Sequence, residues 1–520
     1  MEIPKKIDVV IIGGGATGLG ISRDLSMRGI DNLLLERKDL ACGATGGCHG
    51  LLHSGGRYAV SDPTSAHECI SENQILRRIA AKCVEDTGGL FVTLKSDSLD
   101  YQRKLAEGCS QAGIKTELLS RKECLDLVPA ITDNVHSALY VPDCAIDPFR
   151  LCQLNAFSSR KLGSIIGIHR EVIGLEHDGQ RIKKVNFFNH NTQENEAVEC
   201  KIALIAAGAW SGKVAALAGA KTGVTCSKGS LLVLNHRFAD IVLNRCRPPS
   251  DGDIIVPNEA VSIIGTTAIT VEDPDHYNIE PEELKNLTAA GSELIPDFGN
   301  RRIIREYSGV RPLLGGLQSK GSDRSISRGF TIIDHEQEDG ISGLFSIVGG
   351  KLTTYRLMAE KMADLICAQF DHPVACTTHE VPLEGQDRLK GFPLSKRLDG
   401  LDISRRKGEI VCECELVTDQ EILAVARSLE AINLDDIRRR TRMGMGSCQG
   451  GYCTIRCLEL LLKEGLIQGD DAITRLIAFL EHRYSGILPV LQGDMVREHQ
   501  LIEAIYLSSL NLTASEKKDH

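Results

Sequence analysis

The sequence lacks the features that would place it in a membrane, a secretory system or a nucleic-acid complex. No stretch approaches the roughly 18 to 20 uninterrupted apolar residues that span a bilayer, and Met1–Lys6 lead straight into a predicted strand without a secretory apolar core. Its 60 lysines and arginines are outnumbered by 70 acidic residues, and the net charge of −10 argues against general nucleic-acid binding. Internal repeats and low-complexity tracts are absent as well. We therefore expect a cytoplasmic protein that is at most peripheral to the inner face of the cell membrane.

The composition that is present indicates a folded protein of several domains. A chain of 520 residues is too long for one compact core, and 42% hydrophobic with 25% charged residues is an ordinary globular composition. Most of the 18 cysteines stand alone in the sequence, as expected for reduced thiols at apolar positions. Five of them fall within residues 412–457. This crowding predicts a site of its own.

A dinucleotide-binding βαβ unit is predicted at the N-terminus. The apolar run Ile7–Ile12 suits a buried parallel strand, and it ends in the glycine-rich loop Gly13–Gly18. A helix is expected over Leu19–Arg28, followed by a second strand, Asn32–Leu35, that ends at Glu36. This order of strand, glycine loop, helix, strand and acid is typical of a Rossmann-like unit.

Each small or acidic residue of this unit fits one part of a dinucleotide. Gly13 permits the tight turn, Gly15 lets the backbone approach the pyrophosphate, and Gly18 allows close packing of the helix. The helix N-terminus supplies N–H donors and a positive dipole to the phosphates. Glu36 has the spacing at which a carboxylate receives a ribose hydroxyl. The alternative is a glycine-rich loop beside an incidental surface glutamate. It would explain the loop and the glutamate separately, but not why strand, loop, helix, second strand and acid follow one another at the expected spacing.

Three further segments favour FAD over NAD. Residues 41–50 are small and glycine-rich, so they can run close along an extended ligand. Residues 203–210 and 345–350 each read as a buried strand that ends in small residues, and a helix follows from about Thr354. Several strand ends that return to one crevice suit a long cofactor whose two ends are held by distant segments.

Four cysteines near the C-terminus have the arrangement of a metal centre. Cys412 and Cys414 form a C-x-C pair, and Cys448 and Cys453 form a C-x4-C pair in a glycine-rich context. Four thiolates in two close pairs can ligate a [2Fe–2S] cluster. A tetrahedral zinc site is the alternative, although its usual C-x2-4-C pairs fit this spacing less well. Cys457 is not expected to be a ligand. The basic run 438–442 either offsets the negative charge of the cluster, docks the domain on a partner, or is a solvated helix end.

Three longer motifs resemble the FAD-dependent glycerol-3-phosphate dehydrogenases. They are His49–Tyr58 (HGLLHSGGRY), Tyr307–Leu313 (YSGVRPL) and Gly349–Arg356 (GGKLTTYR). With its cysteine-rich end, the chain looks like the catalytic A subunits of the anaerobic enzymes, which carry a [2Fe–2S] domain similar to bacterioferritin-associated ferredoxin (BFD-like). The resemblance covers nearly the whole chain. It implies that sn-glycerol 3-phosphate is oxidised to dihydroxyacetone phosphate on FAD, with electrons passing through the cluster to partner subunits and quinone.

The resemblance also implies which residues surround the substrate. A phosphate dianion needs several cations that converge from different segments. Arg311 and Arg328 are expected to hold the phosphate, and Arg57, Tyr58 and Lys351 are expected to lie near flavin and substrate. Each arginine alone would more often be a solvated surface charge.

The catalytic base is the second role that the resemblance suggests. Oxidation of a secondary alcohol removes a hydride from carbon and a proton from oxygen. His53 is the leading candidate for the base because imidazole is basic near neutral pH. The alternative is that His53 only hydrogen-bonds the flavin or shapes its loop. The expected catalytic set is His53, Arg57 and Lys351.

The full prediction is an α/β protein with a discontinuous Rossmann-like FAD domain and an α+β substrate or cap domain. The FAD domain is expected over 1–60, 145–225 and 330–371, the cap over 61–144 and 226–329, a linker over 372–406, a small cysteine-rich helical [2Fe–2S] domain over 407–465, and a helical segment over 466–520 that packs on the body or on a partner. Predicted FAD contacts are Gly13, Gly15, Ala16, Thr17, Gly18, Glu36, Thr45, Gly46, Leu52, Val172, Ala207, Gly208, Trp210, Gly349, Gly350, Leu352 and Thr353.

Two other functions fit parts of the same sequence. An FAD oxidoreductase of a 2-hydroxy acid or an amine would use the same fold with fewer cations for phosphate. A redox-sensing or electron-transfer flavoprotein would use the cysteine module as its functional end.

Overall fold

The computed structural model describes residues 3–314, 329–389, 398, 408–429 and 432–506. The chain groups into two compact units. The first comprises residues 1–232, 236–301 and 307–405, and the second comprises residues 406–520 with the short stretches 233–235 and 302–306. The predicted dinucleotide unit belongs to the first unit, and the cysteine cluster belongs to the second.

The N-terminal βαβ unit forms as the sequence predicts. Strand β1 (Lys6–Ile12) pairs in parallel with β2 (Asn32–Leu35) and with β12 (Glu194–Ile205). Between β1 and β2 runs α1 (Ala16–Met27), which begins earlier than the predicted Leu19 because the extended glycine before Ala16 already caps it. The last four residues of β1 are buried, as an apolar strand inside a parallel sheet should be.

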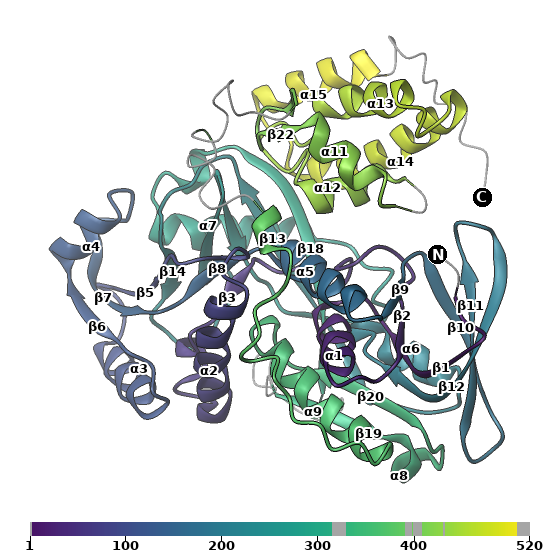
Figure 1. Cartoon of the computed structure of the whole chain (residues 1–520). Helices are drawn as coiled ribbons and strands as arrows, with labels where there is room; N and C mark the ends of the chain where they lie inside the picture. The colour runs from purple at the N-terminus through teal and green to yellow at the C-terminus, as the bar shows by residue number, and fades with distance from the viewer. Residues whose placement is uncertain (1–2, 315–328, 390–397, 399–407, 430–431, 507–520) are drawn as a thin grey trace. The chain divides into compact units, whose positions relative to one another are not determined.

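Eight strands of the described residues form this main sheet. Its path runs β10-β11-β12-β1-β2-β9, with β20 also beside β12 and β19 beside β20. The strands not yet given are β9 (Ile165–Gly167), β10 (Arg170–His177), β11 (Ile182–Asn189), β19 (Phe330–Asp334) and β20 (Leu344–Gly349). Helices α5 (Pro148–Lys161) and α9 (Tyr355–Gln369) pack on α1 (Figure 1). The sheet and these helices therefore form an α/β layer.

A second sheet contains nine strands of the described residues. Its path is β17-β13-β16-β15-β14-β5-β7-β6, with β18 beside β13. The strands are β5 (Gly89–Leu94), β6 (Glu117–Ser120), β7 (Val135–Val141), β13 (Val224–Leu234), β14 (Val242–Arg245), β15 (Ile254–Asn258), β16 (Val261–Gly265), β17 (Ile269–Val271) and β18 (Ile303–Leu314). Most of its neighbours run antiparallel, whereas β14 and β5 are parallel. This mixed sheet fits the predicted α+β cap.

Shorter elements connect and cover the two sheets. A small sheet of β3 (Leu51–Leu52), β8 (Cys144–Ile146) and β4 (Val84–Glu85) carries the glycine- and histidine-rich motif. Among its described residues this unit also contains helices α2 (Pro63–Ile79), α3 (Leu99–Gln111), α4 (Arg121–Leu127), α6 (Ser211–Ala216), α7 (Pro281–Leu294) and α8 (His335–Asp339). The predicted fold class is thus confirmed, while the domain boundaries within this unit stay a prediction.

The first half of the predicted linker packs on the first unit. The backbone N–H of Leu383 donates to the carbonyl of Ile79 at 2.8 Å, and Arg23 donates to the carbonyl of Val381 at 2.8 Å. Residues 390–397 and 399–407 lie outside the described residues. The stretch up to residue 389 is therefore part of the folded body rather than a free tether.

The second unit is helical around a short hairpin. Its elements are β21 (Ile410–Cys412), β22 (Val417–Thr418), α11 (Asp419–Ala426), α12 (Leu434–Thr441), α13 (Cys453–Lys463), α14 (Gly469–Ile487) and α15 (Asp494–Ala504). Residues of α14 and α15, among them Phe479 and Ile502, share one apolar core with Cys412 and Cys453. The described helices of the predicted C-terminal segment, 466–520, thus contribute to the core of the cysteine domain. No helix in the described ranges is long and apolar enough to cross a membrane.

Candidate active site and cysteine centre

A cavity of about 1010 Å³ opens where the parallel strands of the main sheet end. Its wall includes the last residues of β1 and β2, Ile12 and Leu35, and the start of the loop after β12, Ala206. Residues of the second sheet, among them Ile254 and Arg311, line it as well. The volume is at the upper end of the roughly 300 to 1,000 Å³ that hold drug-sized ligands, and the carboxyl ends of such strands are where dinucleotides bind.

The dinucleotide end of this cavity is shaped by glycine and by the N-terminus of α1. Gly13 has φ +119°, and a Cβ there would lie 2.5 Å from the carbonyl oxygen of Ala206. Helix α1 has no acidic residue in its first turn and no side-chain cap, so its dipole favours a phosphate. Glu36 accepts hydrogen bonds from the N–H of Gly14 at 2.7 Å and of Lys38 at 2.9 Å. Burial raises the pKa of the Glu36 carboxyl.

Replacing Gly13 by alanine should therefore abolish FAD retention. The new methyl group would clash with the Ala206 backbone. The position also requires a positive φ, which alanine rarely adopts. Gly29→Ala is the matched control because Gly29 also has positive φ, +76°, but open space around the added Cβ. Flavin per protein after gel filtration is the measurement. Equal flavin content in both variants would contradict the role given to Gly13.

Trp210 and its neighbours form one wall of the same cavity. Its indole Nε1 donates to Asp275 at 2.9 Å, and the guanidinium carbon of Arg37 lies 4.6 Å from its ring centroid. Asp275 also binds Lys213 at 2.9 Å. Arg37 and Lys213 also line the cavity, although they are not among the predicted FAD contacts. The position of Arg37 directly after the ribose-binding candidate Glu36 was the signal that could have found it.

Most of the predicted FAD contacts lie on the cavity wall. They are Gly13, Gly15, Ala16, Thr17, Glu36, Thr45, Val172, Ala207, Gly208, Trp210, Gly349, Gly350, Leu352 and Thr353. Gly18, Gly46 and Leu52 are not among its lining residues. A Cβ on Gly18 would lie 2.0 Å from the Gly13 carbonyl oxygen, so Gly18 serves helix packing, as its place in the motif indicates. Contact of these residues with FAD stays a prediction.

The predicted substrate cations meet in the remaining part of the cavity. Arg57, Arg311 and Lys351 all line it, although they come from three distant segments. Arg57 donates to Asp253 at 3.2 Å and to the Ser250 carbonyl at 3.3 Å. The ammonium group of Lys351 donates to Ser65 at 3.0 Å and lies 5.0 Å from the ring centroid of Tyr58, which lines the cavity too. The predicted partner Arg328 lies outside the described residues.

Arg311 donates hydrogen bonds to several neutral oxygen atoms. Its guanidinium group donates to the carbonyls of Ser227, Lys228 and Thr267, at 3.3, 3.1 and 2.6 Å. A further hydrogen bond at 3.3 Å reaches the hydroxyl of Thr266. These carbonyl groups orient the guanidinium plane of Arg311, which lines the cavity.

His53 lies on a loop whose backbone is fixed on both sides. Its N–H donates to the Thr353 hydroxyl at 3.1 Å, and the next N–H, that of Ser54, donates to buried Asp143 at 2.6 Å. The Asn73 amide donates to the His53 carbonyl at 3.4 Å. The imidazole lines the cavity, with its centroid 5.5 Å from that of Tyr58. The backbone that carries the imidazole is thus fixed.

His49 is a cavity residue to which sequence reasoning gave no role. Its Nδ1 is buried and has no hydrogen-bond partner among the described residues. Burial, with the positive charges of Arg57 and Arg311, lowers the pKa of His49 to about 3. A buried polar atom needs a partner, and a ligand in the cavity can supply one. The signal was its position in the same motif as His53.

The four predicted metal cysteines converge in the second unit. The sulfurs of Cys414 and Cys448 lie 3.9 Å apart, and the thiol of Cys453 hydrogen-bonds those of Cys412 and Cys448. Cys412 ends β21, and Cys453 begins α13. Hydrogen bonds from neighbouring thiols lower the pKa of the Cys448 thiol. Four thiols from two loops thus meet around one centre.

The surroundings of this centre fit an anionic cluster. A Cβ on Gly446 would lie 2.3 Å from the Cys414 Cβ, so only glycine lets the two loops approach. Arg483 donates to the carbonyl of Gln449 at 3.0 Å, and Arg438 donates to the Gln449 side chain at 3.3 Å. Both guanidinium groups are buried. Arg438, from the basic run, is therefore packed beside the cysteine loop and is not a solvated helix end.

Comparisons with known proteins agree with this division. Residues 8–365 match the family described as FAD dependent oxidoreductase, and residues 410–463 match the BFD-like [2Fe-2S] binding domain. The chain is 40% identical to the A subunit of the anaerobic glycerol-3-phosphate dehydrogenase of Escherichia coli (strain K12), over 98% of each chain. The chain belongs to this family of A subunits. It is also 39% identical to the A1 subunit of the Haloferax volcanii enzyme, over 98% of this chain and 91% of the relative.

Solved structures share the fold of this member of the A-subunit family. The glycerol-3-phosphate dehydrogenase of Bacillus halodurans complexed with FAD is 21% identical, with a TM-score of 0.66 over 94% of this chain and 97% of that chain. The L-alpha-glycerophosphate oxidase of Mycoplasma pneumoniae with FAD bound is 19% identical, with a TM-score of 0.59 over 76% of this chain and 100% of that chain. FAD and a [2Fe–2S] cluster are the cofactors of the matched families, and the cavity and the four thiols fit them.

Proposed function

We propose that this chain is the catalytic component that oxidises sn-glycerol 3-phosphate to dihydroxyacetone phosphate. The observation that carries the proposal is the meeting of Arg57, Arg311, Lys351 and His53 in the cavity that begins at the dinucleotide loop. Relatives about 40% identical over nearly the whole chain are named for this activity.

The phosphate is bound by the cationic part of the cavity. Arg311 presents a planar guanidinium group that its carbonyl partners orient, and such a group suits a phosphate better than a point charge does. Lys351 and Arg57 add positive charge from two other segments. Arg328, outside the described residues, is proposed as a second phosphate ligand. With the phosphate fixed at one end, the C2 hydroxyl of the substrate is directed toward the flavin end.

His53 removes the hydroxyl proton in this proposal. Its imidazole nitrogen accepts the proton, and the clamped loop keeps the ring in position while the alcohol becomes a ketone. FAD, when bound, accepts the hydride from the substrate carbon. Arg57 and Lys351 lower the energy of the negative charge that develops on the substrate oxygen.

Electrons then leave through the cysteine centre to other subunits. Cys412, Cys414, Cys448 and Cys453 would hold a [2Fe–2S] cluster, which would supply one-electron transfer. We propose that the acceptors are partner subunits and, through them, quinone, since relatives are named as the A subunits of their enzymes. The chain then acts in the cytoplasm and reaches the inner face of the membrane through those partners.

Anaerobic addition of sn-glycerol 3-phosphate should bleach the flavin absorbance of the purified protein, with dihydroxyacetone phosphate as product. Arg311→Lys should raise the KM for this substrate by about 10- to 100-fold, because hydrogen bonds to charged groups contribute about 1.5 to 3 kcal/mol. Arg103→Lys, an exposed pair partner of Asp100 on α3, is the matched control and should leave the KM unchanged.

Three outcomes would contradict the proposal or one of its parts. Bleaching by a 2-hydroxy acid or an amine, but not by glycerol phosphate, would indicate the oxidoreductase of another substrate class. An unchanged KM in Arg311→Lys, with flavin retained, would remove Arg311 from phosphate binding. Reduction by NADH alone, without any alcohol, would instead favour an electron-transfer flavoprotein.

A further inference from the structure

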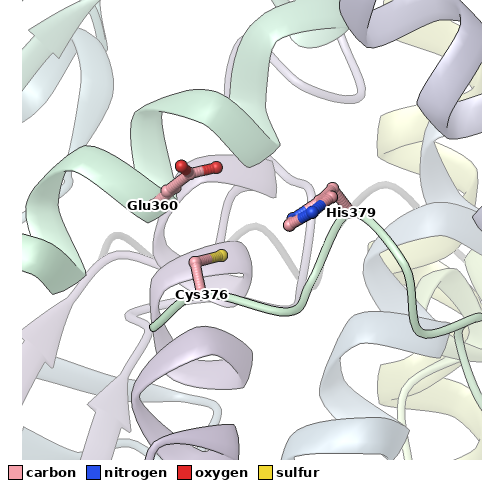
Figure 2. Close-up of side chains that lie close together, drawn as sticks. All are labelled: Glu360, Cys376 and His379. Carbon is pink, nitrogen blue, oxygen red and sulfur yellow. The ribbon is translucent and has the colours of Figure 1, made fainter. Parts of the chain in front are cut away.

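Three side chains of metal-ligand type converge where the segment after α9 folds back on the first unit. Glu360 lies on α9, and Cys376 and His379 lie on the segment that follows this helix. One ligand atom from each lies within 4.8 Å of the other two. Figure 2 shows the three side chains directed toward a common space. None of them lines the flavin cavity, and none belongs to the four-cysteine centre.

The donor set indicates which ion fits. A carboxylate oxygen, a thiol sulfur and an imidazole nitrogen are all ligands of zinc, which binds them at about 2.0 to 2.3 Å in a tetrahedral arrangement. At that geometry the ligand atoms lie roughly 3.5 Å apart, so the three groups need to close by only about 1 Å. Calcium and magnesium prefer oxygen ligands and would not select a thiol. Water completes the fourth position.

The charges around the cluster also favour a cation. Five carboxylates, those of Asp24, Glu72, Glu360, Asp364 and Glu380, face four guanidinium groups here, those of Arg23, Arg28, Arg78 and Arg356. Arg356 is shared between Glu72 and Glu360, and Arg28 is shared between Asp24 and Asp364. The group is therefore net negative even before the Cys376 thiol ionises.

The candidate ligands already have polar partners, which a metal ion would share or replace. Arg356 donates to Oε2 of Glu360 at 2.5 Å, which leaves Oε1 for a metal and holds the carboxylate from behind. The thiol of Cys376 lies 3.2 Å from an oxygen of Asp24 and 3.0 Å from the Thr378 hydroxyl. The backbone carbonyl of His379 accepts from Arg78 at 2.9 Å, which fixes the backbone that carries the imidazole.

We propose that Glu360, Cys376 and His379 bind one zinc ion that fastens the segment 372–389 to α9. The site is separate from both cofactors and has a structural role, because it joins a helix of the FAD-binding body to the chain that leads toward the cysteine domain. Zinc replaces the proton of the Cys376 thiol, which passes to solvent, so the affinity rises with pH.

The test is equilibrium dialysis of the full-length holoprotein, with FAD and the iron–sulfur cluster in place, against micromolar Zn²⁺. Zinc and iron per chain are then measured by elemental analysis. Wild type should take up one zinc per chain without losing iron, and Cys376→Ser and His379→Gln should each lower zinc affinity at least tenfold. His372→Gln, on the same segment but outside the trio, is the matched control and should keep the zinc. Flavin absorbance reports that each variant is folded.

Zinc-edge X-ray absorption distinguishes this site from the four-cysteine centre. A shell of one sulfur with oxygen and nitrogen ligands supports the proposal, and a shell of four sulfurs overturns it. The proposal also fails if wild type takes up no zinc, or if the Cys376 and His379 variants bind as much zinc as wild type. In either case the trio is an ion-paired cluster in which Arg356 alone neutralises Glu360. Both results are independent of the oxidation of glycerol phosphate.

Discussion

His53→Gln should lower the kcat for oxidation of sn-glycerol 3-phosphate by about 10²- to 10⁴-fold, the usual contribution of a general base. Glutamine retains hydrogen-bonding capacity and similar size, but it cannot accept a proton near neutral pH. The backbone bonds of the loop, from His53 to Thr353 and from Ser54 to Asp143, do not depend on the imidazole. Flavin should therefore stay bound.

A second histidine, His49, lines the same cavity, and its role differs from that of His53. His49 is held neutral, since burial and the positive charges of Arg57 and Arg311 lower its pKa to about 3. A group with so low a pKa cannot keep a proton at neutral pH, so we assign proton uptake to His53 and ligand hydrogen bonding to His49. His49→Gln should thus affect KM more than kcat.

The pH dependence of kcat separates the two roles. Wild type should lose activity at acidic pH as the base becomes protonated, and His53→Gln should have a low rate without this acidic limb. His49→Gln should keep the limb. His236 is an exposed histidine outside the cavity, so His236→Gln is the control for the effect of replacing any histidine by glutamine. A full rate in His53→Gln would show that this imidazole only shapes the loop.

The local parts of the fold could be predicted from the sequence because their signals are local. An apolar strand, a glycine turn and a helix follow each other within residues 6–27, and each is fixed by nearby residues. The apolar runs Lys228–Leu234 and Ile263–Gly265 likewise indicate strands, and they lie in β13 and β16. Their place in one mixed sheet depends on pairing between distant segments, which the sequence pattern does not encode.

The packing partner of the C-terminal helices was beyond sequence reasoning. The spacing of Leu476, Phe479 and Leu480 predicts an apolar helix face but not what covers it. In the structure that face completes the core that also contains Cys412 and Cys453. An amphipathic pattern therefore gives the face of a helix, and the tertiary fold selects its partner.

The cationic residues of the flavin cavity and the proposed zinc ligands differ in how well the sequence indicates them. Arg57, Arg311 and Lys351 come from three separate segments of the chain, and only the resemblance to a known family joined them before the cavity did. Cys376 and His379 fall in a stretch that reads as a linker, so nothing in the sequence pairs them with Glu360. Clusters formed by long-range packing are invisible to spacing rules unless a known motif marks them.

Cys448→Ser should remove the [2Fe–2S] cluster and stop electron transfer beyond the flavin. The Cys448 sulfur touches Cys414 and hydrogen-bonds Cys453, so its loss opens the ring of four thiols. A serine hydroxyl is a far poorer ligand for iron than a thiolate. Substrate should still bleach the flavin, because the cavity contains no residue of the cysteine centre. Quinone reduction by the assembled complex should fall to background.

Low-temperature EPR of the dithionite-reduced protein, with iron and sulfide analysis, measures the loss of the cluster. Cys457→Ala is the matched control: Cys457 lies on the same helix as Cys453, and burial raises the pKa of its thiol to about 12, which keeps it protonated. This variant should keep its iron and its EPR signal. A wild-type protein that contains zinc and gives no signal, or a Cys448→Ser variant with full quinone reduction, would contradict the assignment. Because flavin bleaching is measured in the same samples, a failure of the cluster assignment is separated from a failure of substrate oxidation.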